Sequence, residues 1–157
     1  FRNRGARCDE MLEVMRLLMS GEVVEFHGKY FDFPKLQMSP GTVKPVPIWI
    51  GGYSDAALKR AARHEGWVGS MHDIAGLREI MQKLKREREA IGRGVEDFNV
   101  ILAVHDKGRT ADLYRAAEDL GVNHIYKPAW LDEKGRASRL TLDEKLAEMD
   151  RFAERFL

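Results

Sequence analysis

Apolar and polar positions follow two different periods along this chain. Four short apolar runs predict β-strands, over residues 46–50, 67–70, 98–104 and 122–126. After each of the first three runs, apolar residues recur at helical spacing and predict helices over 55–65, 73–91 and 110–120. After the fourth run, the capping box Thr141-x-x-Glu144 opens a last helix, whose apolar stripe continues to Phe156. Four βα units in a row predict a parallel sheet.

The first 45 residues follow another pattern. Residues 6–19 predict a helix with one apolar face, made of Met11, Val14, Met15 and Leu18. Two β-prone segments, 23–26 and 30–33, flank a three-residue turn at 27–29 and so predict a β-hairpin. We therefore expect residues 22–45 to form a hairpin and loop insertion.

Length and unit count set the expected fold class. The chain has 157 residues, which suits one domain, so we expect residues 1–157 to form a single domain. A complete (β/α)8 barrel needs about 250 residues. Four βα units with a hairpin insertion account for half of one, so the expected class is α/β, a partial TIM (β/α)8 barrel. The alternative is a free-standing four-stranded α/β domain.

Composition narrows the class of partner. The chain carries 26 basic and 25 acidic residues, so no global charge attracts nucleic acid or acidic lipid. No apolar run approaches the about 18 residues that a membrane span requires. The single cysteine, Cys8, excludes an internal disulfide and suits a reducing compartment. We expect a cytoplasmic protein that binds neither nucleic acid nor membranes.

A glycine pair stands between the first predicted strand and the first helix after it. Glycines let backbone amides approach a ligand closely, and the first turn of a helix offers unpaired N–H groups at the positive end of its dipole. Ser54, directly after Gly51-Gly52-Tyr53, can add a hydroxyl or simply cap the helix. This segment predicts an anion site, with a structural βα turn as the alternative.

The wider sequence around the glycine pair carries a family resemblance. Residues 45–70 contain Pro-Ile-Trp-Ile-Gly-Gly-x-Ser, Ala-Leu-x-x-Ala-Ala and Gly-Trp. Residues 20–33 add Ser-Gly-Glu and Phe-His-Gly-x-Tyr-Phe. With these motifs the chain resembles the luciferase-like monooxygenases, which are flavin- and deazaflavin-dependent barrel enzymes, over residues 5–70. One departure is that His64-Glu65 runs directly into Gly66-Trp67, where the family commonly has a Gly-Asp pair.

The resemblance implies that this chain supplies the four C-terminal βα units of the barrel. It also implies a small-molecule substrate and a flavin whose phosphate tail binds in this half. FMN is the expected cofactor, and a deazaflavin coenzyme of the F-420 type is the alternative. Barrel enzymes bind ligands at the carboxyl ends of their strands. At these ends we assign the cofactor-binding residues Gly51, Gly52, Ser54, His105 and Lys127.

No catalytic residue is recognisable, because the acid and base groups of the family come largely from the first half of the barrel. The adjacent pairs His64-Glu65 and His105-Asp106 cannot converge on one ion, so we expect no metal site. We expect Glu10 on a solvated helix face and the run from Lys83 to Arg88 on an exposed one. The chain opens on Phe1 and not on methionine, which suggests a piece of a longer protein. The expected function is the C-terminal part of a flavin- or deazaflavin-dependent oxidoreductase or monooxygenase, catalytically incomplete by itself.

Two other functions remain open at this point. One is a non-catalytic half-barrel that binds phosphate or mediates dimerisation. The other is a sugar-phosphate barrel enzyme, which shares the phosphate chemistry but not the tryptophan and hairpin motifs. Because a half-barrel leaves strand edges and the inward faces of strands 46–50 and 98–104 uncovered, we also expect a homo-oligomer.

Overall fold

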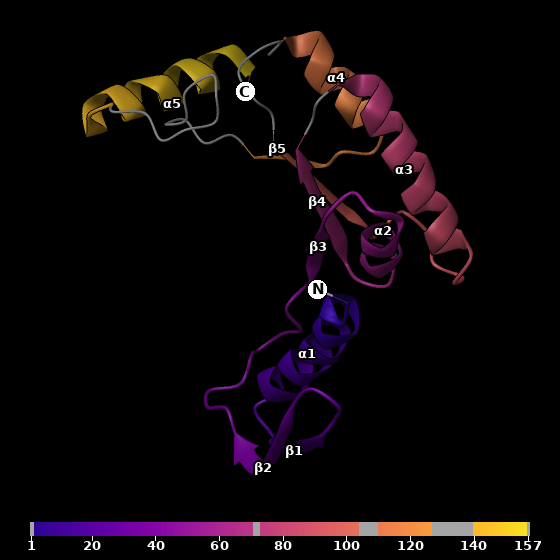
Figure 1. Cartoon of the computed structure of the whole chain (residues 1–157). Coiled ribbons are helices and arrows are strands. Elements are labelled where there is room, and N and C mark those ends of the chain that lie inside the picture. The colour runs from indigo at the N-terminus through magenta and orange to yellow at the C-terminus, as the bar shows by residue number, and fades with distance from the viewer. Residues whose placement is uncertain (1, 71–72, 104–109, 127–139, 157) are drawn as a thin grey trace. The chain divides into compact units, whose positions relative to one another are not determined.

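The computed structural model describes residues 2–70, 73–103, 110–126 and 140–156 (Figure 1). The chain divides into two compact units, Phe1–Ile48 and Trp49–Leu157. The insertion expected at 22–45 falls in the first unit, and the four βα units fall in the second. The grouping of residues 1–157 in a single domain stays a prediction.

The first unit contains one helix and one hairpin. Its elements are α1 Arg4–Met19, β1 Val23–His27 and β2 Asp32–Gln37, and the two strands pair antiparallel. The hairpin is confirmed, but its loop has four residues, 28–31, and not three. His27 pairs with Asp32 at the end of the ladder, where Nδ1 and Oδ1 lie 2.6 Å apart, and the Gly28 amide donates to the Phe31 carbonyl at 2.9 Å.

The buried face of α1 differs in part from the predicted one. Leu12 and Val14 are buried, whereas Met11 and Met15 are 40% and 36% exposed. The hairpin loop contacts the helix at Arg7, whose guanidinium lies 5.6 Å from the ring centroid of Phe31. Arg7 lies on the same face of the helix as the buried Val14, which follows two turns later.

Glu10 fixes the hairpin loop to α1. Its Oε1 accepts hydrogen bonds from the backbone amides of Tyr30 at 2.7 Å and Phe31 at 2.8 Å. The sequence indicated that this carboxylate lies on a solvated helix face, which is wrong. Burial raises the pKa of Glu10, but the amide hydrogen bonds and the charge of Lys29 outweigh it and leave the pKa below its ordinary value.

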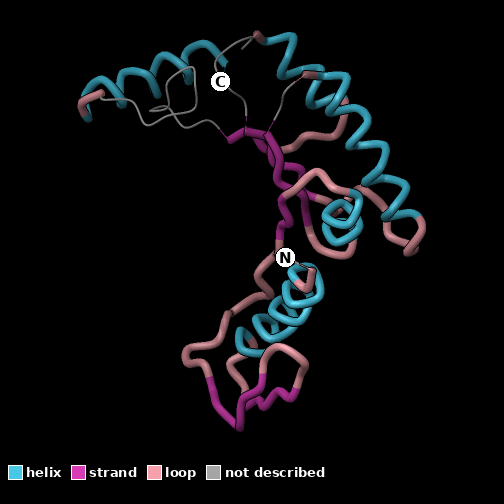
Figure 2. Tube along the Cα trace, in the orientation of Figure 1, coloured by secondary structure: helices cyan, strands magenta, loops and turns pink. Residues whose placement is uncertain are grey.

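The second unit is a four-stranded parallel sheet with a helix after each strand. The strands run in the order β3-β4-β5-β6, with every neighbouring pair parallel, at Trp49–Gly51, Gly66–Ser70, Asn99–Ala103 and His124–Tyr126. The helices are α2 Asp55–Ala62, α3 Ile74–Glu89, α4 Ala111–Asp119 and α5 Leu142–Phe156. This order confirms the four predicted βα units (Figure 2).

Most element boundaries lie within two or three residues of the prediction. The largest difference is β2, which ends at Gln37 and not at residue 33. Another is β3, which begins at Trp49 and not at residue 46. Pro45 and Pro47 explain it, because proline has no N–H to donate to a sheet ladder. The capping box of α5 is confirmed, since the Thr141 amide donates to Glu144 Oε2 at 2.7 Å and the Glu144 amide donates to Thr141 Oγ1 at 3.3 Å.

The core of the second unit lies between the sheet and helices α2, α3 and α4. Side chains alternate along the strands, so that every second residue points toward these helices. The residues that are almost fully buried there are Leu58, Trp67, Leu84, Val100 and Leu102.

Two glycines of β4 make room for tryptophan rings. A Cβ at Gly69 would lie within 3 Å of the Trp67 ring, and a Cβ at Gly66 would lie within 3 Å of the Trp49 ring. Any larger residue at either position would displace an indole. The spacing Gly-Trp-x-Gly in this strand therefore follows from the packing of its own tryptophan and of the tryptophan on the neighbouring strand.

The other face of the sheet is open within the second unit. Trp49, Val68 and Tyr126 point to this face and are 40%, 36% and 54% exposed. For strands 46–50 and 98–104 we expected an inward face made of alternate residues, either from Val46 to Ile50 or from Val100 to Val104. Val100 and Leu102 instead face the helices. Val104 lies outside the described residues. Parallel sheets are normally covered on both faces, so an open apolar face is unusual.

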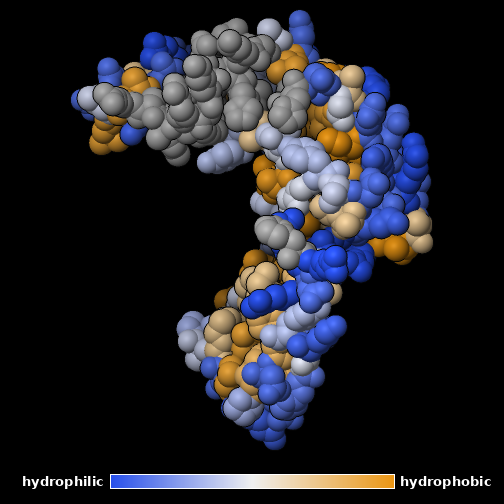
Figure 3. All heavy atoms as spheres, in the orientation of Figure 1, coloured by the Kyte–Doolittle hydropathy of each residue, from blue (hydrophilic) through white to orange (hydrophobic). Residues whose placement is uncertain are grey.

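Arg88 is the buried exception in a charged helix segment. The surface over α3 is hydrophilic (Figure 3), and Lys83, Lys85 and Arg86 are exposed as the sequence predicted. Arg88 is only 5% exposed and lies 4.4 Å from the ring centroid of Phe98. Burial, and then the charge of Arg93, lower its pKa, but an arginine stays cationic in this situation.

The guanidinium of Arg88 donates to three backbone carbonyl groups. Nη1 donates to the carbonyl oxygens of Ala62 at 3.1 Å and His64 at 3.2 Å, at the end of α2, and Nε donates to the carbonyl of Gly94 at 2.5 Å. A cation at the C-terminus of a helix is also favoured by the helix dipole. Arg88 therefore fixes the end of α2 to the segment that follows α3.

We predict that Arg88→Gln lowers the free energy of unfolding by about 3 kcal/mol, because buried carbonyl groups lose charged donors. Urea unfolding of the variant measures the change. Arg86→Gln is the matched control in the same helix, and because Arg86 is exposed it should change stability by less than about 0.5 kcal/mol. Equal effects of the two variants would contradict the role given to Arg88.

We predict that the hairpin loop separates from α1 in acid. Because the folded pKa of Glu10 is lowered, the carboxylate stabilises the first unit above the ordinary pKa of a glutamate, and this contribution is lost as the pH falls through the lowered value. Hydrogen exchange of the Tyr30 and Phe31 amides measures it. Glu10→Ala should remove the protection of both amides at neutral pH, whereas Glu13→Ala, on an exposed position of α1, should leave it unchanged.

Candidate functional site

The turn between β3 and α2 consists of residues 51–54. Gly52 has a φ of +118°, a conformation that other residues rarely adopt. A Cβ at Gly52 would also lie 2.9 Å from the Cβ of Ala57. Gly51 is different, because a Cβ there would meet only the carbonyl oxygen of Val68, at 3.6 Å, which is ordinary contact. Gly52 is thus required by the turn itself, whereas Gly51 leaves space that a ligand can use.

Ser54 is the N-cap of α2. Its Oγ accepts a hydrogen bond from the Ala57 amide at 3.3 Å, and its carbonyl oxygen accepts one from the Leu58 amide at 2.9 Å. Among the residues that the structure describes, none accepts from the amides of Asp55 or Ala56. Both residues are exposed. The start of α2 therefore offers two N–H groups and a hydroxyl to a ligand.

Two aromatic side chains hold the turn from the adjacent strand. The indole Nε1 of Trp67 donates to the Gly52 carbonyl at 2.9 Å. The hydroxyl of Tyr53 accepts from the Ser70 amide at 2.5 Å and lies 2.9 Å from both the carbonyl oxygen and the Oγ of Ser70. The rings of Tyr53 and Trp67 meet edge to face, with centroids 5.9 Å apart. The turn is thus tied to β4 at its middle and at its end.

Local charges favour an anion at the start of α2. Asp55 in its first turn pairs with Lys83, whose Nζ lies 2.9 Å from Oδ1. The hydrogen bond and then the charge of Lys83 lower the pKa of Asp55, so the carboxylate is ionised but neutralised. At the start of α3, in contrast, the cap is the carboxylate of Asp73, which accepts from the Gly76 amide at 2.6 Å. A carboxylate cap repels a second anion, so α2 is the better anion site of the two.

The structure brings together part of the predicted site. Gly51, Gly52 and Ser54 form one turn, and Ser70 at the end of β4 lies beside it. His105 and Lys127 lie outside the described residues, so their assignment stays a prediction. The sequence did not single out Tyr53, because it occupies the variable position of the Gly-Gly-x-Ser motif. An aromatic residue at that position, with a serine at the end of the next strand, was the available signal.

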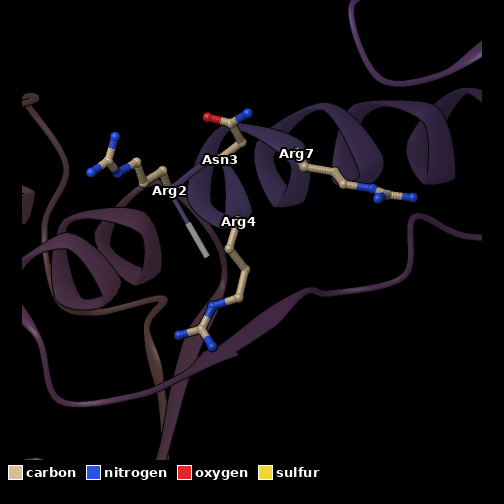
Figure 4. Close-up of a pocket in the computed structure, with 4 residues that line it drawn as sticks. All are labelled: Arg2, Asn3, Arg4 and Arg7. Carbon is tan, nitrogen blue, oxygen red and sulfur yellow. The ribbon is translucent and has the colours of Figure 1, made fainter.

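A hollow at the start of α1 is a weaker candidate for an anion site. Figure 4 shows the hollow at the start of α1, where the side chains of Arg2, Arg4 and Arg7 extend in different directions and do not converge on one anion. Within the described ranges, no three His, Cys, Asp or Glu side chains gather closely enough to hold a metal ion. The described helices include none that is long and apolar enough to cross a membrane.

The comparison with protein families agrees with the sequence motifs. The family model for luciferase-like monooxygenases matches residues 1–106. The chain belongs to the luciferase-like monooxygenase family. The match extends beyond residue 70, where the motif resemblance ended, and includes β4, α3 and β5. The residues matched also contain the whole Gly51–Ser54 turn.

Relatives within the luciferase-like family include mycobacterial proteins. An uncharacterized protein of Mycobacterium tuberculosis is 36% identical over 154 residues, which cover 98% of this chain and 53% of the relative. An F420-dependent hydroxymycolic acid dehydrogenase of the same species is 29% identical, over 73% of this chain and 34% of that protein. The chain spans about half the length of the first of these relatives.

Solved structures support the fold. The monooxygenase RslO1 from Streptomyces bottropensis superposes with a TM-score of 0.71 at 18% sequence identity, over 99% of this chain and 61% of that chain. The likeness covers part of a longer barrel, as expected for four βα units of a luciferase-like enzyme. The predicted fold class, a partial TIM barrel, is thereby confirmed.

Proposed function

We propose that this chain is the C-terminal part of a deazaflavin-dependent oxidoreductase and that the turn of residues 51–54 binds the phosphate of the cofactor. The observation that carries the proposal is the combination of two unpaired amides, at Asp55 and Ala56, with Gly51, where a Cβ would make only ordinary contact. Backbone amides at a helix N-terminus bind phosphate well. The neutral Ser54 cap of α2 and the pairing of Asp55 with Lys83 also favour phosphate binding there.

The choice of cofactor rests on the relatives. From the sequence, FMN was the first expectation and an F-420 type deazaflavin the alternative. The hydroxymycolic acid dehydrogenase is F420-dependent by name, and this favours the deazaflavin. FMN stays the alternative, because the proposed contacts are made to a phosphate, which both cofactors carry.

The proposed role of this chain in the reaction is to bind and orient. A deazaflavin, when bound, supplies hydride transfer. The residues of the turn would fix its phosphate. The relative's name favours a hydroxyl-bearing small molecule as substrate. None of the described residues is assigned as catalytic acid or base, and these groups are expected elsewhere in the complete enzyme.

We predict that the chain binds a deazaflavin with its phosphate at least tenfold more tightly than the same deazaflavin without it. Tenfold corresponds to about 1.4 kcal/mol. Gly51→Val should remove this preference, because its side chain fills the space beside the turn, while valine suits the end of a strand. Fluorescence titration with the two compounds measures the preference, and FMN against riboflavin repeats the comparison for the alternative cofactor.

Two controls accompany the titration. Thermal unfolding of Gly51→Val should match that of the unmodified chain, because the added Cβ has room. Gly52→Ala should instead lower stability by about 1–3 kcal/mol, since it strains a residue at positive φ. A folded Gly51→Val variant that retains the full phosphate preference would contradict the proposed site and favour a structural turn or a non-catalytic module.

We further propose that the open face of the sheet is covered in solution by a second copy of this chain. The face presents Trp49, Val68 and Tyr126, which is more apolar surface than a parallel sheet normally leaves uncovered. We predict a dimer or larger oligomer by light scattering at micromolar concentration. Val68→Glu should shift the population toward the 18.0 kDa monomer. A stable monomer before any substitution would overturn this proposal and leave the phosphate site unaffected.

A further inference from the structure

Tyr53 is the residue of the turn that makes the most contacts with another element. Its hydroxyl accepts from the Ser70 amide at 2.5 Å and donates to either the carbonyl oxygen or the Oγ of the same residue, each 2.9 Å away. Two of these three contacts are to backbone atoms. The position of the hydroxyl is therefore determined by the backbone of Ser70 at the end of β4, and not by the rotamer of the Ser70 side chain.

The ring of Tyr53 is partly exposed. It meets the edge of Trp67 at a centroid distance of 5.9 Å, but 44% of the residue is exposed. A cavity of about 60 Å³ lies against it, with Trp67, Ser70, Asp73 and Leu77 among its lining residues. Packing alone does not fix a ring between solvent and a cavity. Its hydroxyl contacts with Ser70 therefore help to hold the ring, and with it the turn, in place.

We infer that Tyr53 is a positioning residue, which fixes the phosphate-binding turn by joining it to the backbone of Ser70. The inference rests on the proposed function of that turn. Gly52 is already held at its carbonyl by the Trp67 indole, 2.9 Å away, so Tyr53 provides the second fixed point, directly before Ser54. Two fixed points preorganise the N–H groups of the turn, which reduces the entropy lost when phosphate binds.

Through the same contact, the protection of the Ser70 amide depends on whether the turn has bound a ligand. Phosphate bound at residues 51–54 would restrict Tyr53, and Tyr53 would then protect the Ser70 amide. The Ser70 amide donates to the Tyr53 hydroxyl in this structure, so the coupling appears as an increase in the protection of that amide when phosphate binds. The Ser70 amide therefore reports on a ligand that does not need to touch it.

Tyr53→Phe tests this role, because it keeps the ring and removes the hydroxyl. In titrations with the deazaflavin and its phosphate-free form, the variant should lose about fivefold in affinity for the phosphate-bearing compound and bind the phosphate-free one unchanged. Its melting temperature should stay within about 2 °C of the unmodified chain, since the contact is exposed. In hydrogen exchange, the phosphate-bearing compound should slow exchange at Ser70 in the unmodified chain and not in Tyr53→Phe.

Ser70→Ala is the matched control. It removes one of the three contacts and leaves the two to backbone atoms, so its effect on phosphate affinity should be less than twofold. Unchanged phosphate preference in Tyr53→Phe would overturn the positioning role and leave the proposed function intact. Absence of any phosphate preference in the unmodified chain would overturn both.

Discussion

The hydrogen bond from the Trp67 indole to the Gly52 carbonyl connects the core of the second unit to the candidate site. Trp67 is completely buried between the sheet and its helices, and its ring occupies the space that Gly69 leaves free. The N–H at its edge reaches the turn and donates to the Gly52 carbonyl at 2.9 Å. Because core packing fixes the indole, it also fixes the turn.

A second constraint is that the sheet buries one face only. Helices α2, α3 and α4 cover the side of Val100 and Leu102, while the side of Trp49, Val68 and Tyr126 stays open in the second unit. The candidate turn belongs to the open side, because Gly51 pairs with Val68 on β4. Ligand space and uncovered apolar surface therefore lie on the same face. This agrees with the family, in which the chain accounts for about half of a relative's length.

Much of the second unit could be predicted from the sequence, because strand and helix periods alternate there and each helix has a cap. The Gly-Gly-x-Ser turn was found for the same reason. What the sequence could not supply was contact between distant residues. Glu10 was taken as solvated because nothing in its own helix indicates the hairpin loop 20 residues later, and Arg88 was grouped with exposed charges because its acceptors are carbonyl groups, which no side-chain pattern reveals.

Capping residues also explain why neighbouring βα turns of one sheet differ in what they can bind. A helix N-terminus attracts anions through unpaired amides and its dipole. Asp73 satisfies α3 with a charge, so little positive potential remains at that end. Ser54 caps α2 with a neutral hydroxyl. The only carboxylate in the first turn of α2, Asp55, is paired with Lys83 of α3. The availability of an anion site in this fold thus depends on whether the cap is charged as well as on the glycines.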